Sequence, residues 1–304
     1  KFFYLEVPRN YGEKPTAKDC KKALEEVYYE RNAYRIVPLT DDPEVINAVV
    51  KFVDAISNPV DKRECVSFVS YENNKINDHS DLFELIEKVG TMSTNIKSKR
   101  INNVYFGDSV ELSVGMKRYI LPPYFMNAAI AFLDAKVGMA DPISTRIIDV
   151  FDKINGPRFR PRDWNRLAEL GVFIVYRERK NAPAKIRHQL TTMRGSTSRP
   201  ELVEYSSVKN LDATVQLVRD RLDPYAGKEN IVDGFFEKVD SAFTTAIEDA
   251  KDSKYIKGVE QLTPWEIRKV DNGLHSREIK TNIFGKYRLF PVYPGNNIDV
   301  LFLI

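Results

Sequence analysis

Residues 34–56 read Tyr-Arg-Ile-Val-Pro-Leu-Thr-Asp-Asp-Pro-Glu-Val-Ile-Asn-Ala-Val-Val-Lys-Phe-Val-Asp-Ala-Ile. The first part, Tyr34–Leu39, is mainly apolar and contains a proline near its end, which is typical of a short buried strand. Asp41 and Pro43 follow, and both residue types are favoured at the start of a helix. Apolar residues then recur at helical spacing, at Val45, Ile46, Val49, Phe52, Val53 and Ile56. The stretch therefore predicts a strand followed directly by a helix over Asp41–Ile56.

The same alternation extends over the first two hundred residues. Further strands are predicted at Phe2–Val7, Cys65–Tyr71, Asn103–Gly107, Val172–Arg177 and Lys185–Thr191. Further helices are predicted at Thr16–Glu30, Asp81–Val89, Pro122–Ala135, Ser144–Asp152 and Asp163–Glu169, the last followed by Gly171 as its C′ residue. Strands that alternate with helices favour a layered α/β domain with a mostly parallel sheet.

The pattern changes after a polar, turn-rich break at Thr192–Pro200. Two amphipathic helices are expected next, one over Leu211–Leu222 and one over Phe235–Ile247, and extended segments from Tyr255 onward. We therefore expect a first, α/β domain over residues 1–194 and a second, α+β domain over residues 195–304.

The chain ends in a strongly apolar segment. Its apolar side chains are Ile298, Val300, Leu301, Phe302, Leu303 and Ile304, with Asp299 as the one charged residue. Such a segment is expected to pair with a sheet, either of its own chain or of a neighbouring subunit. We interpret these six residues as a subunit-interaction segment. Pro291, Pro294 and Gly295 precede it and predict either a hinge or the turn of an ordinary hairpin.

The remaining features argue for a structural protein. The apolar content of 43% is sufficient for a real core, and no apolar run is long enough to span a membrane. Two cysteines and three histidines show no metal-ligand spacing, and no phosphate-binding loop or nucleophile motif is present. We therefore predict no catalytic residue, no cofactor and no metal site.

Two other functions stay open at this point. The net charge of +3 arises from 46 basic and 43 acidic residues, so it favours no particular partner. A basic stretch containing Arg158, Arg160, Arg162 and Arg166, with Phe159 and Trp164 between them, is compatible with a nucleic-acid-binding module. An α/β hydrolytic enzyme is the other alternative.

Several motifs then resemble contractile tail sheath proteins of bacteriophages. Tyr119–Ala131, with Asp141–Ser144 after it, resembles the family's helix that follows a Pro-Pro pair and leads into a loop with Pro. Asn165–Val172 resembles its Asn-x-Leu-x-x-x-Gly-Val pattern, and Gln189–Thr192 its strand end. The loop Tyr225–Asn230 resembles the opening of the family's C-terminal domain, and Tyr34–Asp42 its strand followed by proline.

This resemblance implies an α/β, subtilisin-like but non-catalytic sheath domain, a C-terminal sheath domain ending in an extended arm, and an N-terminal arm before Lys1. It also implies subunits that polymerise as stacked hexameric rings, contact a tail tube protein and the baseplate and tail terminator proteins, and contract to drive the tube through the host envelope during genome delivery. Neither membrane insertion nor direct nucleic-acid contact is expected. The location implied is the virion tail, assembled in the host cytoplasm. A sheath subunit of a related contractile injection system is the nearest alternative.

Overall fold

The computed structural model describes residues 7, 16–30, 33–58, 61, 63–71, 82–179, 182–197, 199–225, 234–270 and 280–293, and for residues 264–270 and 280–285 it describes the backbone. The chain divides into two compact units, the first up to Val208 and the second over Lys209–Pro294. The strand predicted at Phe2–Val7 lies outside the described residues except for Val7. The assignment of residues 1–194 and 195–304 to two sheath domains stays a prediction.

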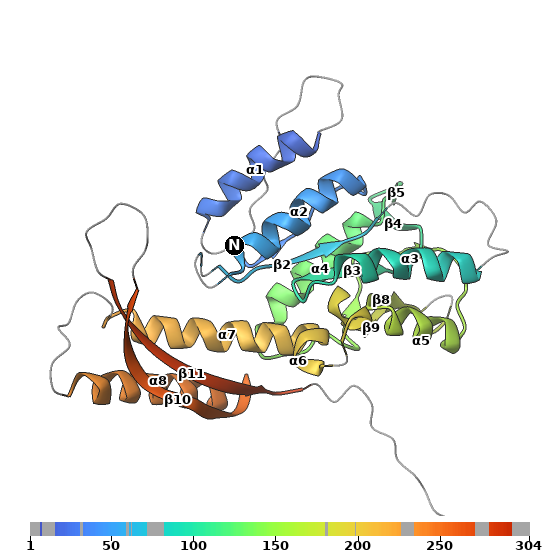
Figure 1. Cartoon of the computed structure of the whole chain (residues 1–304). Coiled ribbons are helices and arrows are strands. Elements are labelled where there is room, and N and C mark those ends of the chain that lie inside the picture. The colour runs from blue at the N-terminus through green and yellow to red at the C-terminus, as the bar shows by residue number, and fades with distance from the viewer. Residues whose placement is uncertain are drawn as a thin grey trace, which may run out of the picture. The chain divides into compact units, whose positions relative to one another are not determined.

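The first unit is built on a six-stranded sheet (Figure 1). Its strands, in spatial order, are β1 (Arg35–Ile36), β2 (Val66–Val69), β3 (Ile101–Tyr105), β8 (Val172–Tyr176), β9 (Ala184–His188) and β6 (Ile147–Ile148). The first four are parallel, whereas β9 is antiparallel to both β8 and β6. The predicted α/β class, with a mainly parallel sheet, is confirmed for this unit.

Helices cover both faces of this sheet. They are α4 (Tyr124–Val137) on one face and α1 (Ala17–Tyr29), α2 (Pro43–Ile56), α3 (Leu82–Ile96) and α5 (Pro161–Glu169) on the side of the other. The side chains of β8 alternate between the two faces. Phe173 and Val175 pack in the core with α4, whereas Val172 and Ile174 pack with α3 and α5. Strands that are buried on both faces are apolar at every position rather than at alternate ones.

Helices α1 and α2 begin within two residues of their predicted starts at Thr16 and Asp41. Thr16 caps α1 by accepting a hydrogen bond from Asp19 N–H, while the Asp19 carboxylate accepts from Thr16 N–H. Asp42 caps α2 through a 2.8 Å hydrogen bond from Glu44 N–H, with Pro43 at the first helical position. Such caps satisfy N–H groups that have no partner inside the helix.

The helix predicted at Ser144–Asp152 is wrong. The segment contains β6, and Thr145 adopts a left-handed conformation with φ of 63°. Ile147 and Ile148 are β-branched and pair with Lys185 and Ala184 of β9. A helix over these nine residues would have only about two and a half turns and is marginal by itself, whereas a strand gains backbone hydrogen bonds from β9.

A second, three-stranded sheet belongs to the same unit and has the order β5–β4–β7. Its strands are β4 (Ser109–Val114), β5 (Lys117–Leu121) and β7 (Lys153–Asn155), all antiparallel. The sequence analysis predicted no strand in this region. The alternation of Val110, Leu112 and Val114 before Gly115 is the signal that marks the hairpin.

The break between the two halves of the sequence contains a short 3₁₀ helix (Thr192–Gly195) and α6 (Pro200–Val203). The long helix α7 (Tyr205–Leu222) follows, and the division between the units falls within it. The second unit continues with α8 (Phe235–Asp252) and the strands β10 (Ile256–Val270) and β11 (Lys280–Pro291). The two predicted helices and the extended segments after Tyr255 are therefore confirmed.

A buried polar network lies inside the first unit, where Asp134 of α4 meets β1 and the first residue of α7. Asp134 and Tyr205 are both fully buried. The Asp134 Oδ2 atom accepts hydrogen bonds from Arg35 Nε–H and from the Tyr205 hydroxyl, each at 2.5 Å. Because a buried carboxylate is costly unless it is paired and hydrogen-bonded, the three residues stabilise each other.

Candidate assembly surfaces

The second unit presents a long two-stranded antiparallel ribbon made of β10 and β11 (Figure 1). One face of the ribbon packs on α8 and the end of α7. The residues of this core are Leu217, Val218, Leu222, Phe243, Ile247, Ala250, Tyr255, Ile256, Val259, Tyr287 and Leu289. The Phe243 and Tyr287 rings stack with centroids 4.1 Å apart. The opposite face carries the cross-strand ion pair between Arg288 and Glu260 at 2.9 Å.

Both long edges of this ribbon lack a strand partner within the described part of the chain, since β10 pairs with β11 and each has one neighbour. An unpaired strand edge presents a row of N–H and C=O groups that can bind a further strand. A ribbon of 15 and 12 residues with two such edges is the most extended acceptor for another strand in the described structure. It is therefore our candidate assembly surface.

The residues that the sequence analysis assigned to subunit interaction lie outside the described residues, namely Ile298, Val300, Leu301, Phe302, Leu303 and Ile304. Of the predicted hinge, Pro294 and Gly295 also lie outside them. Pro291 is described: it is buried at the last position of β11, opposite Ile256. The roles of these residues stay predictions.

The hairpin of β4 and β5 is a second exposed surface that the sequence analysis did not single out. Val110 is buried in the core, whereas Val114 is 59%, Met116 fully and Ile120 70% exposed. The apolar side chains of the hairpin are thus buried at its base and exposed to solvent toward its turn. At the base, Glu111 is buried and forms ion pairs with Arg118 and with Lys153.

The arginine cluster does not form an exposed platform for nucleic-acid bases. Trp164 is buried, and Phe159 packs between it and Tyr105, with ring centroids 4.5 and 5.7 Å away. Arg166 forms ion pairs with Glu87 and Glu169. Base binding by stacking requires aromatic faces that are open to solvent. The aromatic residues of this stretch are used instead to pack α5 on the sheet.

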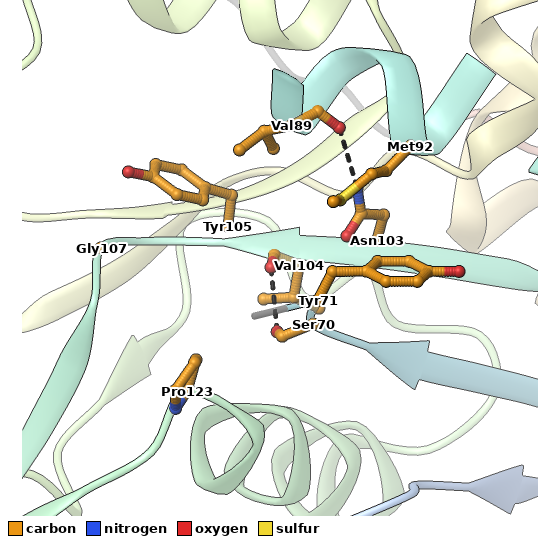
Figure 2. Close-up of a pocket in the computed structure, with 9 residues that line it drawn as sticks. All are labelled: Ser70, Tyr71, Val89, Met92, Asn103, Val104, Tyr105, Gly107 and Pro123. Carbon is orange, nitrogen blue, oxygen red and sulfur yellow. Dashed lines mark hydrogen bonds between the residues drawn. The ribbon is translucent and has the colours of Figure 1, made fainter. Parts of the chain in front are cut away.

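A small pocket lies at the carboxyl ends of β2 and β3, where active sites of α/β proteins are often found (Figure 2). It measures about 240 Å³, including open solvent, and Ser70, Asn103 and Pro123 are among its lining residues. The Ser70 hydroxyl lies 3.0 Å from the Val104 carbonyl oxygen and 2.9 Å from Asn127 Oδ1. The Asn103 side chain donates to the Val89 carbonyl. These polar groups therefore already have partners inside the protein.

Among the residues that line this pocket, the ionisable ones are Tyr71 and Tyr105. Burial, with a smaller effect of the neighbouring Arg187, lowers the pKa of His188 to about 4, so its imidazole is neutral at pH 7. His79 and His275 lie outside the described residues.

Within the described ranges, no three His, Cys, Asp or Glu side chains are placed to hold a metal ion. Among the helices described, none combines the length and the apolar character that crossing a membrane requires.

Tyr105, at the end of β3, is expected to lower the stability of the chain. Its hydroxyl is buried and has no hydrogen-bond partner among the described residues. Burial, and secondarily the charge of Asp108, raises the pKa of this phenol. Leaving a buried donor unsatisfied costs about 1–3 kcal/mol. Tyr105→Phe is therefore expected to raise the free energy of unfolding at pH 7 by about that amount, as measured by urea denaturation.

The same substitution should change the pH dependence of stability. Below pH 10 a tyrosine whose folded pKa is raised is protonated in both states, and its contribution is constant. Above pH 10 the unfolded chain loses protons that the folded chain keeps, so stability falls by up to about 1.4 kcal/mol per pH unit for each such tyrosine. Tyr105→Phe should reduce this slope between pH 10 and 12. If the fall of stability with pH is as steep in this variant as in the unsubstituted chain, the pKa of Tyr105 is not raised by burial.

Tyr71→Phe is the matched control, because burial raises the pKa of Tyr71 to about 12 while its hydroxyl donates to Asn47 Oδ1 at 3.4 Å. Tyr71→Phe should also reduce the fall of the free energy of unfolding between pH 10 and 12. It should not raise the free energy of unfolding at pH 7, because the Tyr71 hydroxyl already has a partner.

Comparisons with known proteins place the fold. No protein-family model matches this chain, and no curated protein matches it in sequence. Solved structures do match. A sheath tail protein from Desulfitobacterium hafniense is 11% identical and aligns with a TM-score of 0.64 over 91% of this chain and 61% of its own length. This chain thus spans less than two thirds of that protein.

Two contractile assemblies give similar values. The helical sheath of the anti-feeding prophage in its contracted state is 11% identical, with a TM-score of 0.63 over 94% of this chain and 74% of that one. The sheath of an extracellular contractile injection system, PVC, also contracted, is 9% identical, with a TM-score of 0.60 over 93% and 74%. The proteins that this chain resembles are therefore sheath tail proteins and sheaths of contractile injection systems, and at 9–11% identity the likeness establishes that the chain has their fold.

Proposed function

We propose that this chain is a structural subunit of a contractile sheath and polymerises with copies of itself into a tube. The observation that carries the proposal is the likeness to sheath proteins over more than nine tenths of the chain, which includes both compact units. Within this proposal the first unit corresponds to the subtilisin-like, non-catalytic sheath domain and the second to the C-terminal sheath domain.

The two-stranded ribbon supports self-assembly. A ribbon with two unpaired edges is expected to bind a further strand, and the apolar segment Ile298–Ile304 has the composition of such a strand. Strand addition combines backbone hydrogen bonds with burial of alternate side chains. In the proposed sheath, this segment of one subunit completes the ribbon of another, and Pro291, Pro294 and Gly295 form the hinge that lets the connection bend.

Contraction follows from this arrangement in physical terms. The densely packed units move as rigid bodies, since closely packed cores do not deform continuously, and the connections between subunits take up the change. Exposed ion pairs such as Arg221–Asp249 contribute little individually, about 0.2–1 kcal/mol each. Contacts repeated across an assembly can nevertheless favour one arrangement of the lattice over another.

The finer identity of the particle is part of the proposal. We favour a phage tail sheath of stacked hexameric rings that surrounds a tail tube protein, ends at baseplate and tail terminator proteins, and serves genome delivery. The sheath of a related injection system is the alternative, and two of the structures that this chain resembles come from such systems. Genome neighbours that encode either capsid proteins or injected toxins distinguish the two.

Electron microscopy of the purified chain, together with any residues that precede Lys1, tests the proposal directly. We expect hollow tubes with regular striations, whose diffraction gives the helical symmetry. Monodisperse monomers across a range of salt and protein concentrations would overturn the proposed function.

A further inference from the structure

Helix α1 is attached to the first unit by a small buried contact. Of its 13 residues, Cys20, Ala23 and Leu24 are buried, and the helix packs on α2 (Figure 1). Helix α2 buries six residues of its own, in a core that it shares with strands β2 and β3. An isolated helix of fewer than about 12–15 residues is marginal in water. Few buried apolar contacts are typical of elements that open locally while the rest of a protein stays folded.

The buried side of α2 is wider than one neighbour requires. Its buried residues are Val45, Ile46, Ala48, Val49, Val53 and Ile56. At 100° per residue they span about 160° of the helix, whereas a stripe of about 100° is enough to face one core. The strands and α1 both belong to the core that these residues form, and together they account for its width. Departure of α1 would therefore uncover apolar side chains of α2.

Arg63, in the loop between α2 and β2, holds the C-terminal end of α1. Its two terminal nitrogens each donate to the Val27 carbonyl oxygen at 3.2 Å, and one of them also donates to the Glu30 carbonyl. Helix C-termini favour a nearby positive charge, and α1 has no basic residue in its own last turn. A residue 36 positions away from Val27 thus supplies the charge that this helix end lacks.

The same loop also holds a side chain of α1. The Tyr28 hydroxyl donates to Asp61 Oδ1 at 2.8 Å, and the Arg63 guanidinium lies 5.5 Å from the centre of the Tyr28 ring. Asn58 donates to the other Asp61 carboxylate oxygen at 2.7 Å and so orients it. Both contacts join the last turn of α1 to one loop, so breaking them frees that end of the helix.

We propose that α1 is a strap that opens while the rest of the first unit stays folded, and that Arg63 and Asp61 are the latch that keeps it closed. In the closed state α1 covers part of the apolar surface of α2 and buries the Cys20 thiol. In the open state both are accessible to solvent. The strap is a property of the single subunit and does not depend on a sheath lattice.

The Cys20 thiol reports the opening, because it is 5% exposed and a thiol reagent reaches it when α1 leaves α2. An aromatic disulfide that releases a coloured thiolate measures the labelling rate in a full chain carrying Cys65→Ser. The control chain carries Cys20→Ser, Cys65→Ser and Ala131→Cys. Ala131 is buried on α4, in the core on the opposite face of the sheet, so a thiol there reports unfolding of the whole unit.

We expect the Cys20 thiol to react about tenfold faster than the control thiol, or faster still, because local opening is more frequent than global unfolding. Its rate should also depend less on urea, since opening α1 exposes less surface than unfolding the unit. Equal rates with equal urea dependence would overturn the proposal, because α1 would then open only when the whole unit unfolds.

The latch is tested in the Cys65→Ser chain by Arg63→Ala and by Tyr28→Phe, which removes only the hydroxyl that donates to the loop. Arg158→Ala, at an exposed arginine of the same unit, is the matched control. We expect Arg63→Ala to speed the labelling of Cys20 by about tenfold or more, because hydrogen bonds from a charged donor are lost, and Tyr28→Phe to speed it by a smaller factor. If neither variant is labelled faster than Arg158→Ala, the loop does not hold α1 and the proposed latch is wrong.

Discussion

A chain shortened to end at Asn297 is expected to fold as the full chain does and to form no tubes. The deleted segment contains six apolar residues, which we propose to add as a strand to a neighbouring copy. If burial in a neighbouring copy stabilises two of these side chains, at about 1.5–3 kcal/mol each, their loss weakens the contact by about 3–6 kcal/mol. That change corresponds to a roughly 140- to 20,000-fold weaker association.

Two measurements are needed for this prediction. Electron microscopy and sedimentation report tube formation, and thermal unfolding followed by circular dichroism reports whether the body of the protein is intact. A fall in melting temperature of the unassembled chain would show that the segment belongs to the subunit's own core. Tubes like those of the unshortened chain would contradict the strand-addition hypothesis.

A second variant separates backbone from side-chain effects. Replacing the six apolar residues of 298–304 by threonine keeps every backbone N–H and C=O group and a high strand propensity, but removes most of the apolar surface. We expect assembly that is weaker than that of the unsubstituted chain and stronger than that of the shortened one, because main-chain hydrogen bonds contribute to strand addition independently of the side chains.

Asp134→Ala is expected to be the most destabilising single substitution discussed for the first unit. It removes the carboxylate that Arg35 and Tyr205 share and leaves a guanidinium whose side chain is 16% exposed. Removing one partner of a buried ion pair typically costs about 3–5 kcal/mol. Since a typical domain is stable by 5–15 kcal/mol, the loss is a large part of the total.

Urea denaturation of three variants tests this expectation. Tyr205→Phe removes a single hydroxyl and should cost about 1–3 kcal/mol, less than Asp134→Ala. Asp149→Ala changes an exposed residue of the same unit and should stay within about 0.5 kcal/mol of the unsubstituted chain. If Asp134→Ala costs no more than Asp149→Ala, the network does not stabilise the fold.

The sequence alone was sufficient for most elements whose cause is local. Helix α2 is an example, because the aspartates before Pro43, Pro43 itself and the apolar spacing that follows indicate its start to within two residues and its buried face, without reference to any other part of the chain. The buried strands β2, β3 and β8 were also predicted, since each lies in a short segment rich in Val, Ile, Phe and Tyr, as is common for strands covered on both faces. The resemblance to sheath proteins likewise depended on motifs spaced along the whole chain.

Tertiary structure decided the features that depend on partners distant in sequence. The segment around Ile147 and Ile148 has enough apolar residues for either a helix or a strand, and pairing with β9 makes it a strand. The Asp134 carboxylate accepts hydrogen bonds from Arg35, 99 positions before it, and from Tyr205, 71 positions after it. No local sequence pattern indicates contacts over such separations.

The ribbon is the clearest case, because its pairing shifts register at three places and each extra residue lies on β10. Nothing in the composition of β10 shows which residues are the extra ones, because a bulge exists only relative to the strand that it faces. The sequence by itself thus determined where helices and strands form and which segment has the character of an added strand. Only the folded structure decided where the ribbon is irregular, since the register of a strand is set by its pairing with the strand beside it.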